Sequence, residues 1–225
     1  MSITRVLAFP TRAIVLSAVP FIATPELSLY RGIRFGMSVA TVAEQCHISP
    51  EPRIVDRRPE LIQELMWMPA RVEGTAADSV QKVLFTFYND RLARIAVSYE
   101  RSRTEGLTAE DLIEAISATY GGTALSAVGT AAGSKAGNLD DRILARWEDA
   151  DTSITLFRSR YLSTFGLVLL SKQLDALTTV AHAEAVLLDE RDAPARESAR
   201  QQKRSDDDRL KEEAVRRVNK AAFKP

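Results

Sequence analysis

The sequence predicts an α+β fold: an antiparallel sheet with helices on one face, two β-β-β-α halves, and a long charged C-terminal helix. Three observations lead to this prediction. Apolar and polar residues alternate over residues 83–99, with one break at Asn89-Asp90. Three strand patterns followed by a helix pattern occur over residues 61–120 and again over 142–191. After Pro194 the chain becomes rich in charges of both signs and poor in large apolar groups.

Residues 83–99 are the clearest local signal. Val83, Phe85 and Phe87 point to one side of a predicted strand, and Ile95 and Val97 continue the alternation after the break. Runs of β-branched and aromatic residues with a period of two, separated by a two-residue polar turn, are typical of a β-hairpin. Asn and Asp tolerate the left-handed backbone that such a turn requires.

The stretch before the hairpin predicts a short helix and a further strand. Gly36 permits a turn and Ser38 stands at an N-cap position. A buried stripe at helical spacing follows it: Val39, Val42, Ala43 and Cys46. Residues 61–68 lie between Pro59 and Pro69 and alternate two largely apolar sets. This favours a strand paired with residues 83–88, and a helical turn is the alternative.

A second helix is predicted to begin after Thr108, where Asp111 completes a capping box. Its expected buried residues are Leu112, Ile113, Ile116 and Tyr120, and Gly121-Gly122 ends it. Residues 123–138 are rich in Gly, Ala and Ser, which is typical of a low-complexity linker or a long loop.

Strand patterns then return at residues 143–148, 153–161 and 165–170, and a helix is expected from about Lys172. We expect Pro194 to interrupt this helix. Beyond it, the stripe Leu210, Ala214, Val218 and Ala222 is narrow. It fits either an exposed helix that docks along one seam or a segment that frays on its own.

The amino terminus resembles a secretory signal peptide. Arg5 and Arg12 precede the apolar residues 13–23, a run that is too short to cross a hydrocarbon layer of ~30 Å. Pro20 and Phe21 depart from the usual pattern, and an amphipathic or unstructured arm is the alternative. The expected organisation is residues 1–28 as signal peptide or arm, 29–191 as one domain with halves 29–122 and 139–191, and 192–225 as a charged tail. The expected location is periplasmic or secreted, with the cytoplasm as the alternative.

Composition excludes several classes of function. Lys and Arg total 30 and Asp and Glu total 30, so no net charge attracts the chain to nucleic acid. The single cysteine excludes an internal disulfide and a cysteine-built zinc site. The two histidines argue against a histidine-built metal site. No cofactor, metal, nucleic acid or membrane span is expected.

Few residues suggest catalysis. Cys46 and His47 are adjacent, but neighbours on a helix point about 100° apart and cannot form a nucleophile-base pair. His182 falls beside an apolar stripe and is expected to be a partly exposed helix residue. Two acidic groups are expected to be solvated: Glu148, Asp149 and Asp151 in a turn, and the residues 206–208, which lack calcium-loop spacing.

A binding surface on the sheet is the stronger prediction. If the helices cover one face, Thr86 and Ser98 reach solvent on the other, together with a set rich in Arg and Tyr. The candidate binding residues in this set are Tyr88, Arg94, Arg146, Arg158 and Arg160. The strand phase around Arg158 stays open, because Ile154 and Leu156 share its parity.

Residues 35–38, Phe-Gly-Met-Ser, with Val42 and the hairpin segment 87–92, carry a family resemblance. The chain resembles exported bacterial proteins of unknown function with a Tyr-Arg start and a Thr-Ala-Glu-Asp helix. It is distantly similar to small outer-membrane assembly lipoproteins of the β-lactamase-inhibitor-protein-like fold. The missing lipidation cysteine and the long second half are departures, so the assembly role of those lipoproteins is not carried over.

The resemblance implies a compact binding or assembly module. The expected function is therefore a non-catalytic exported binding or assembly module of unknown ligand, and the sheet face or the C-terminal helix is where it could bind another protein. The alternatives are a small periplasmic hydrolase with an unrecognised site and a cytoplasmic scaffold or regulatory protein.

Overall fold

The computed structural model describes residues 26–69, 78–121, 142–159, 164–222 and 224. Its elements in chain order are β1 (Leu29–Tyr30), β2 (Ile33–Arg34), α1 (Val39–Gln45), β3 (Arg53–Asp56), β4 (Ile62–Trp67), β5 (Val80–Tyr88), β6 (Arg91–Tyr99), α2 (Arg101–Thr104), α3 (Ala109–Tyr120), β7 (Arg142–Glu148), β8 (Thr152–Arg158), β9 (Phe165–Ser171) and α4 (Lys172–Ala222). The predicted linker and signal segment fall largely outside these ranges.

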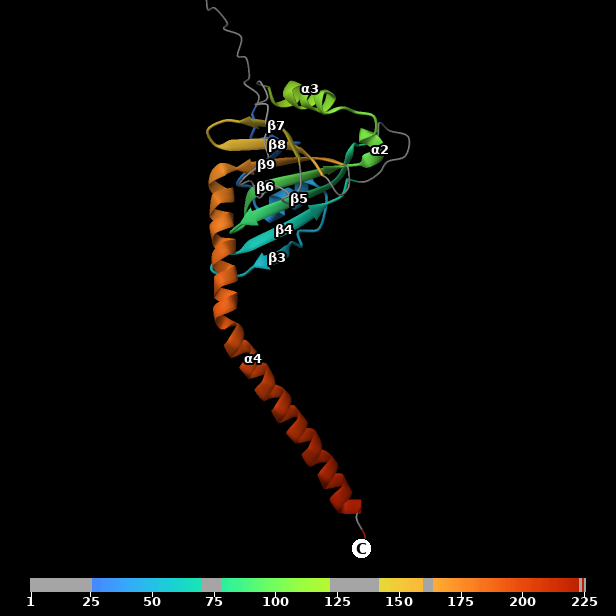
Figure 1. Ribbon diagram of the computed structural model, residues 1–225, viewed down its shortest axis with the longest axis vertical. Coiled ribbons are helices and arrows are strands. Elements are labelled where there is room, and N and C mark those ends of the chain that lie inside the picture. Colours follow the sequence, from blue (N-terminus) through green and yellow to red (C-terminus); the bar gives the residue numbers. More distant parts are fainter. Residues whose placement is uncertain (1–25, 70–77, 122–141, 160–163, 223, 225) are drawn as a thin grey trace, which may run out of the picture.

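Seven strands form one antiparallel sheet in the order β3-β4-β5-β6-β9-β8-β7 (Figure 1). The α+β class with an antiparallel sheet is confirmed, as are the two runs of three strands and a helix. The halves join through their third strands, β6 and β9, with Ala96 opposite Val168. The edge strand β3 was not predicted.

The predicted hairpin is β5 and β6, and its turn is Asn89-Asp90, with both residues at positive φ (46° and 60°). The turn also holds neighbouring elements. Asn89 accepts a hydrogen bond from the backbone N–H of Leu61 at 3.0 Å, and Asp90 accepts one from Val39 at 2.8 Å. One tight turn therefore fixes both the entry to β4 and the first residue of α1.

The preference for a strand over residues 61–68 is confirmed, because β4 pairs with β5 and places Leu65 opposite Phe85. Other local predictions also hold. Ser38 caps α1 and accepts from Thr41 N–H at 3.2 Å, and Gly36 has φ +84°. The capping box of α3 forms between Thr108 and Asp111.

The main core lies between the sheet and helices α1 and α3, which cover the same face. From the sheet it includes Val83, Phe85, Phe87, Leu92, Ile95, Val97, Ile154, Leu156, Leu167 and Leu169, all at most 1% exposed. The apolar stripe of α1 is buried as predicted. Helix α3 packs on the core through Ile116 and Tyr120.

The last helix, α4, begins at Lys172 as predicted and runs without a break to Ala222. The expected interruption at Pro194 is wrong. Proline removes one helical hydrogen bond and bends a helix, but the flanking turns can continue on either side of it. Figure 1 shows α4 changing direction where it leaves the sheet.

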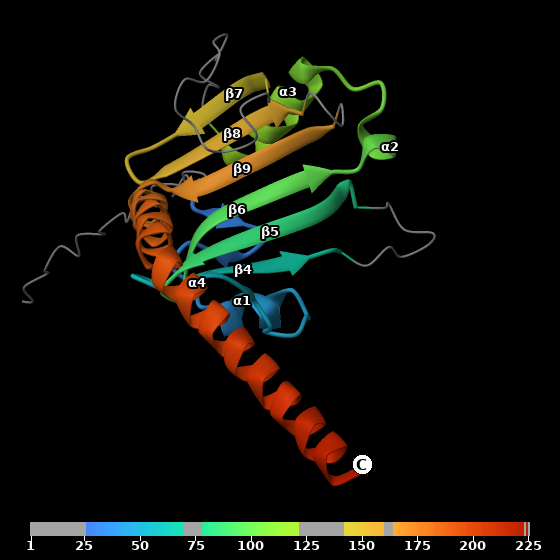
Figure 2. The ribbon, with the colours of Figure 1, turned by 60° about the horizontal axis from the view of Figure 1, so that its bottom comes forward.

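The first turns of α4 cross the sheet on the face opposite α1 (Figure 2). Leu174, Ala181 and Ala185 are buried there, whereas Leu177 is 42% exposed. Arg94 of β6 forms an ion pair with Asp175, and both side chains are largely buried, at 23% and 16% exposure. The expectation that Arg94 faces solvent is therefore wrong, because α4 covers it.

The two faces of β5 and β6 give a stability test. We expect Phe85→Ala to destabilise the fold by about 3–5 kcal/mol, because it opens a cavity in the main core. Arg94→Ala should cost less, about 1–2 kcal/mol, since it leaves the Asp175 carboxylate half-buried without this cation. Urea unfolding of both variants measures this. An Arg94→Ala loss as large as that of Phe85→Ala would contradict this assignment of the faces.

Candidate functional site

The predicted binding residues do not meet in one place. Tyr88, Arg94 and Arg146 project to the face opposite the main core, but Arg94 and Arg146 stand three strands apart. At ~4.8 Å per strand this separates their backbones by about 14 Å. Arg158 alternates with Phe157 and has the parity of Leu156, which belongs to the main core. Arg160 lies outside the described residues.

Each of these residues has its own surroundings. Arg158 is exposed, with its guanidinium carbon 5.3 Å from the Phe165 ring centroid. Arg146 is half-buried, and its Nε has no hydrogen-bond partner among the described residues. Tyr88 is half-buried at the end of β5, opposite Ile62. A shared binding role for this set stays a prediction.

The docked part of α4 is held by side-chain contacts to distant parts of the chain. Besides Asp175, His182 Nδ1 lies 2.7 Å from Asp56 Oδ2 at the end of β3. Further along, Arg58 contacts Asp192 at 2.6 Å and Asp189 at 3.3 Å. His182 is partly exposed, as predicted, and its carboxylate neighbour is a structural partner from the sheet edge. These contacts fix the direction in which α4 leaves the domain.

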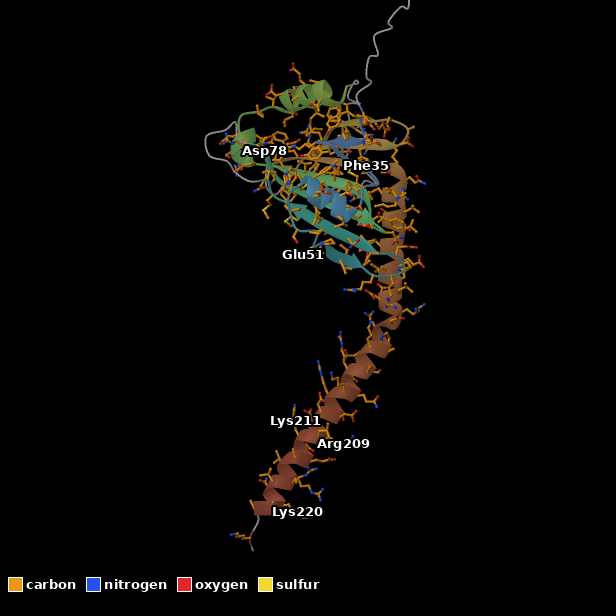
Figure 3. All side chains as sticks on the ribbon, turned by 180° about the vertical axis from the view of Figure 1, so that it is seen from behind. Phe35, Glu51, Asp78, Arg209, Lys211 and Lys220 are labelled. Carbon is orange, nitrogen blue, oxygen red and sulfur yellow. The ribbon has the colours of Figure 1, made fainter. Side chains whose placement is uncertain are left out.

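Beyond Asp192 the helix stands alone. Every residue of 193–222 is exposed except Asp206, which is half-buried. At 1.5 Å per residue this segment, the projecting helix, is ~45 Å long. The charged side chains labelled on it in Figure 3, Arg209, Lys211 and Lys220, surround a helix that touches nothing else in the described chain.

The apolar stripe of the projecting helix has no cover. Leu210, Val215 and Val218 are 60%, 59% and 66% exposed. The ion pairs recorded for residues 197–222 join neighbours within the helix, such as Arg209–Asp206 and Lys211–Asp208, each at 3.3 Å. The possibility that this stripe docks on its own sheet is therefore wrong, because the helix points away from the domain.

A second cluster lies at the other end of the sheet and was not predicted. Arg31, at φ +50° in the turn between β1 and β2, makes two hydrogen bonds to Asp78, at 2.5 and 2.7 Å. Its guanidinium carbon lies 5.6 Å from the Tyr30 ring centroid and 5.9 Å from that of Trp67. Figure 3 shows Asp78 at the end of the sheet away from α4.

Burial shapes the acid-base behaviour of this cluster. It raises the pKa of Tyr30 well above its usual range and that of Tyr120 to about 12. The Tyr30 hydroxyl is buried and has no partner among the described residues. The hydrogen bonds from Arg31 lower the pKa of Asp78. The arrangement clamps the β1-β2 turn to the start of β5, and the Tyr-Arg start noted in the sequence was its only visible signal.

The described residues offer no catalytic constellation around Cys46. Its side chain is 7% exposed, and burial raises its pKa to about 11, so the thiol stays protonated at neutral pH. Cys46 follows α1 on one face of the sheet, and His182 belongs to α4 on the other. Among the described residues no group of three or more His, Cys, Asp or Glu is placed to hold a metal ion. In the same ranges no helix is long and apolar enough to span a membrane.

Comparisons of the chain with protein-family models, with curated proteins and with solved structures give no match. The resemblance to exported assembly modules therefore stays a prediction that rests on the quoted motif.

The Arg31–Asp78 pair gives a pH-dependent prediction. The folded pKa of Asp78 is lowered, so its contribution to stability is present above the unfolded value of about 3.9 and is lost as the pH falls through the lower folded value. We expect Asp78→Asn to destabilise the protein at pH 7 and to differ little from the wild type at about pH 2. Urea unfolding across this range measures the difference, with the exposed Glu51→Gln as control. An equal loss at both ends of the range would contradict the linkage.

Proposed function

We propose that the protein is a non-catalytic binding or assembly module that engages a protein partner through the projecting helix. The observation that carries this proposal is the exposure of residues 193–222 over their whole length. A helix with so thin an apolar stripe gains little from propensity alone. Exposed Leu210, Val215 and Val218 gain free energy when another surface covers them. The sheet domain, residues 26–192, then holds the projecting helix in a fixed direction.

The side-chain contacts at the base of α4 support this proposal. Asp175, His182 and Asp192 are bound from β6, β3 and the β3-β4 connection, so the helix is held at three places before it projects. A passive tail would need no such anchoring. The hydrolase alternative has no supporting geometry in the described ranges, because Cys46 is buried away from His182.

Export is part of the proposal and rests on the basic and apolar pattern of residues 1–28. An exported module with an anchored helix suits assembly at the cell envelope. The alternative of a cytoplasmic scaffold would use the same helix in another compartment.

The first test removes the projecting helix. Deletion after Pro194 keeps the anchors Asp175, His182, Asp189 and Asp192, so the melting temperature should change by no more than about 2 °C. A photocrosslinking residue at Val218 should give a discrete adduct in the source cells. The same residue at Leu187, which is as exposed but lies on the docked part, is the matched control. A large fall in melting temperature, or equal adducts at both positions, would contradict the proposal.

The second test concerns export. Mass spectrometry of the protein recovered from its native compartment should show an amino terminus between residues 24 and 28. Met1 or Ser2 intact in a cytoplasmic fraction would support the scaffold alternative instead.

A further inference from the structure

Charge is unevenly divided between the sheet domain and the projecting helix. Residues 26–192 contain 18 basic and 24 acidic side chains, whereas the projecting helix, residues 193–222, contains 9 basic and 6 acidic ones. The balanced total therefore hides an acidic domain joined to a basic helix. Opposite net charges on two parts of one chain favour contacts between them, within or between copies.

One uninterrupted part of this acidic charge lies on α3 and in the turn before it. Residues 104–121 contain four carboxylates and no Lys or Arg, and all four are exposed: Glu105, Glu110, Asp111 and Glu114. The nearest basic side chains in sequence are Arg101 and Arg103 on α2. Beside the carboxylates, Leu107 is 44% exposed, and Leu112 and Ile113 are only partly buried. This surface combines negative charge with accessible apolar area.

The basic charge is concentrated at the free end of α4. Residues 214–225 contain Arg216, Arg217, Lys220 and Lys224 and no acidic residue. At 100° per residue, the three basic side chains within the helix occupy an arc of about 100°. Val215, Val218 and three alanines occupy an arc of about 120° on the other side. Arg216, Arg217 and Lys220 are all exposed and form no ion pair with another described residue.

These two surfaces cannot meet within one copy. Figure 1 shows α3 and the free end of α4 at opposite ends of the molecule. The domain anchors hold the base of α4, and the projecting helix extends ~45 Å away from the sheet. A contact between them therefore requires a second copy.

We propose that the basic end of α4 in one copy binds the acidic face of α3 in another, so that the chains associate head to tail. This inference rests on the proposed function of the projecting helix and names its partner. The acidic residues 206–208 and Glu212-Glu213 would be repelled by α3, so the contact is confined to the last turns of the helix. Valine and alanine give those turns a shallow apolar face, which suits packing on another helix better than insertion into lipid.

The geometry and the charge set the character of the association. Two short helix faces bury less than the roughly 1,200–2,000 Å² of a standard interface, so the contact is weak. Its Coulombic part is screened over about 10 Å at 0.1 M salt. Because the two surfaces differ, the contact is heterologous, so it extends into open chains unless its geometry closes a ring.

The test is sedimentation velocity of the full-length protein over a range of concentrations at low salt and at about 0.5 M salt. The mean mass should rise with concentration at low salt and fall to that of the monomer at high salt. One variant reverses the helix end (R216E/R217E/K220E), and another reverses the carboxylates on α3 and in the turn before it (E105K/E110K/E114K), with Asp111 kept because it caps α3. Each should weaken association by about tenfold or more, and a chain that carries both reversals should recover it.

The matched control moves three charges elsewhere. Glu44, Glu51 and Glu190 are exposed and form no ion pair within the described part of the chain, so E44K/E51K/E190K should leave association unchanged. Circular dichroism melts of all variants check that each is folded. A wild type that stays monomeric at low salt, a control that weakens association equally, or a double reversal that restores nothing would overturn the proposal.

A further arm separates this inference from the proposed function. Anionic vesicles that bind the wild type but not the R216E/R217E/K220E variant, with no self-association, would place the helix end on a membrane and overturn the self-contact. If the crosslinked adduct at Val218 contains a different protein and the wild type is monomeric, the proposed function is supported. Head-to-tail association is then contradicted.

Discussion

The antiparallel pairing of β6 with β9 is the contact on which the rest of the structure depends. Each half alone would leave one long strand with unpaired backbone groups along an edge. Pairing the two third strands places both in the middle of the sheet and lets one core run beneath both halves. The fully buried Ile95 and Leu169 stand opposite one another at this seam.

The same pairing determines where α4 begins. Since β9 is an inner strand, the helix that follows it starts near the middle of the sheet and must cross β6, β5 and β4 to reach the edge strand β3. On that path it meets Arg94 and Asp56, and then Arg58 in the connection after β3. A helix that followed an edge strand would have left the sheet at once. The anchoring of the projecting helix is therefore a consequence of strand order.

Pro194 shows how a local rule yields to its context. Proline costs a helix interior about 3 kcal/mol, and the sequence pattern favoured a break there. Four residues later the Ser198 hydroxyl donates a hydrogen bond to the Pro194 carbonyl at 3.0 Å, one of several side-chain contacts that continue along this stretch. Arg196 also donates to the Asp189 carbonyl across the proline. The helix bends instead of ending. The charged residues after Pro194 therefore belong to the same continuous helix.

The sequence by itself determined the local elements of this protein. The alternation of apolar and polar residues places Phe85 and Ile95 on the buried face. The Asn89-Asp90 turn connects the two strands of the hairpin, and the N-caps Ser38 and Thr108 mark where α1 and α3 begin. These features depend on neighbours within a few residues, so a single sequence carries them. Only the tertiary structure decided which strands lie at the seam, that α4 covers Arg94, and that Arg31 meets Asp78 or His182 meets Asp56. Arg31 and Asp78 are 47 residues apart in the sequence, and His182 and Asp56 are 126 apart. Many other pairings of residues so far apart would be compatible with the same strand and helix patterns. Burial of one continuous core selects among them, and that selection is a property of the whole chain.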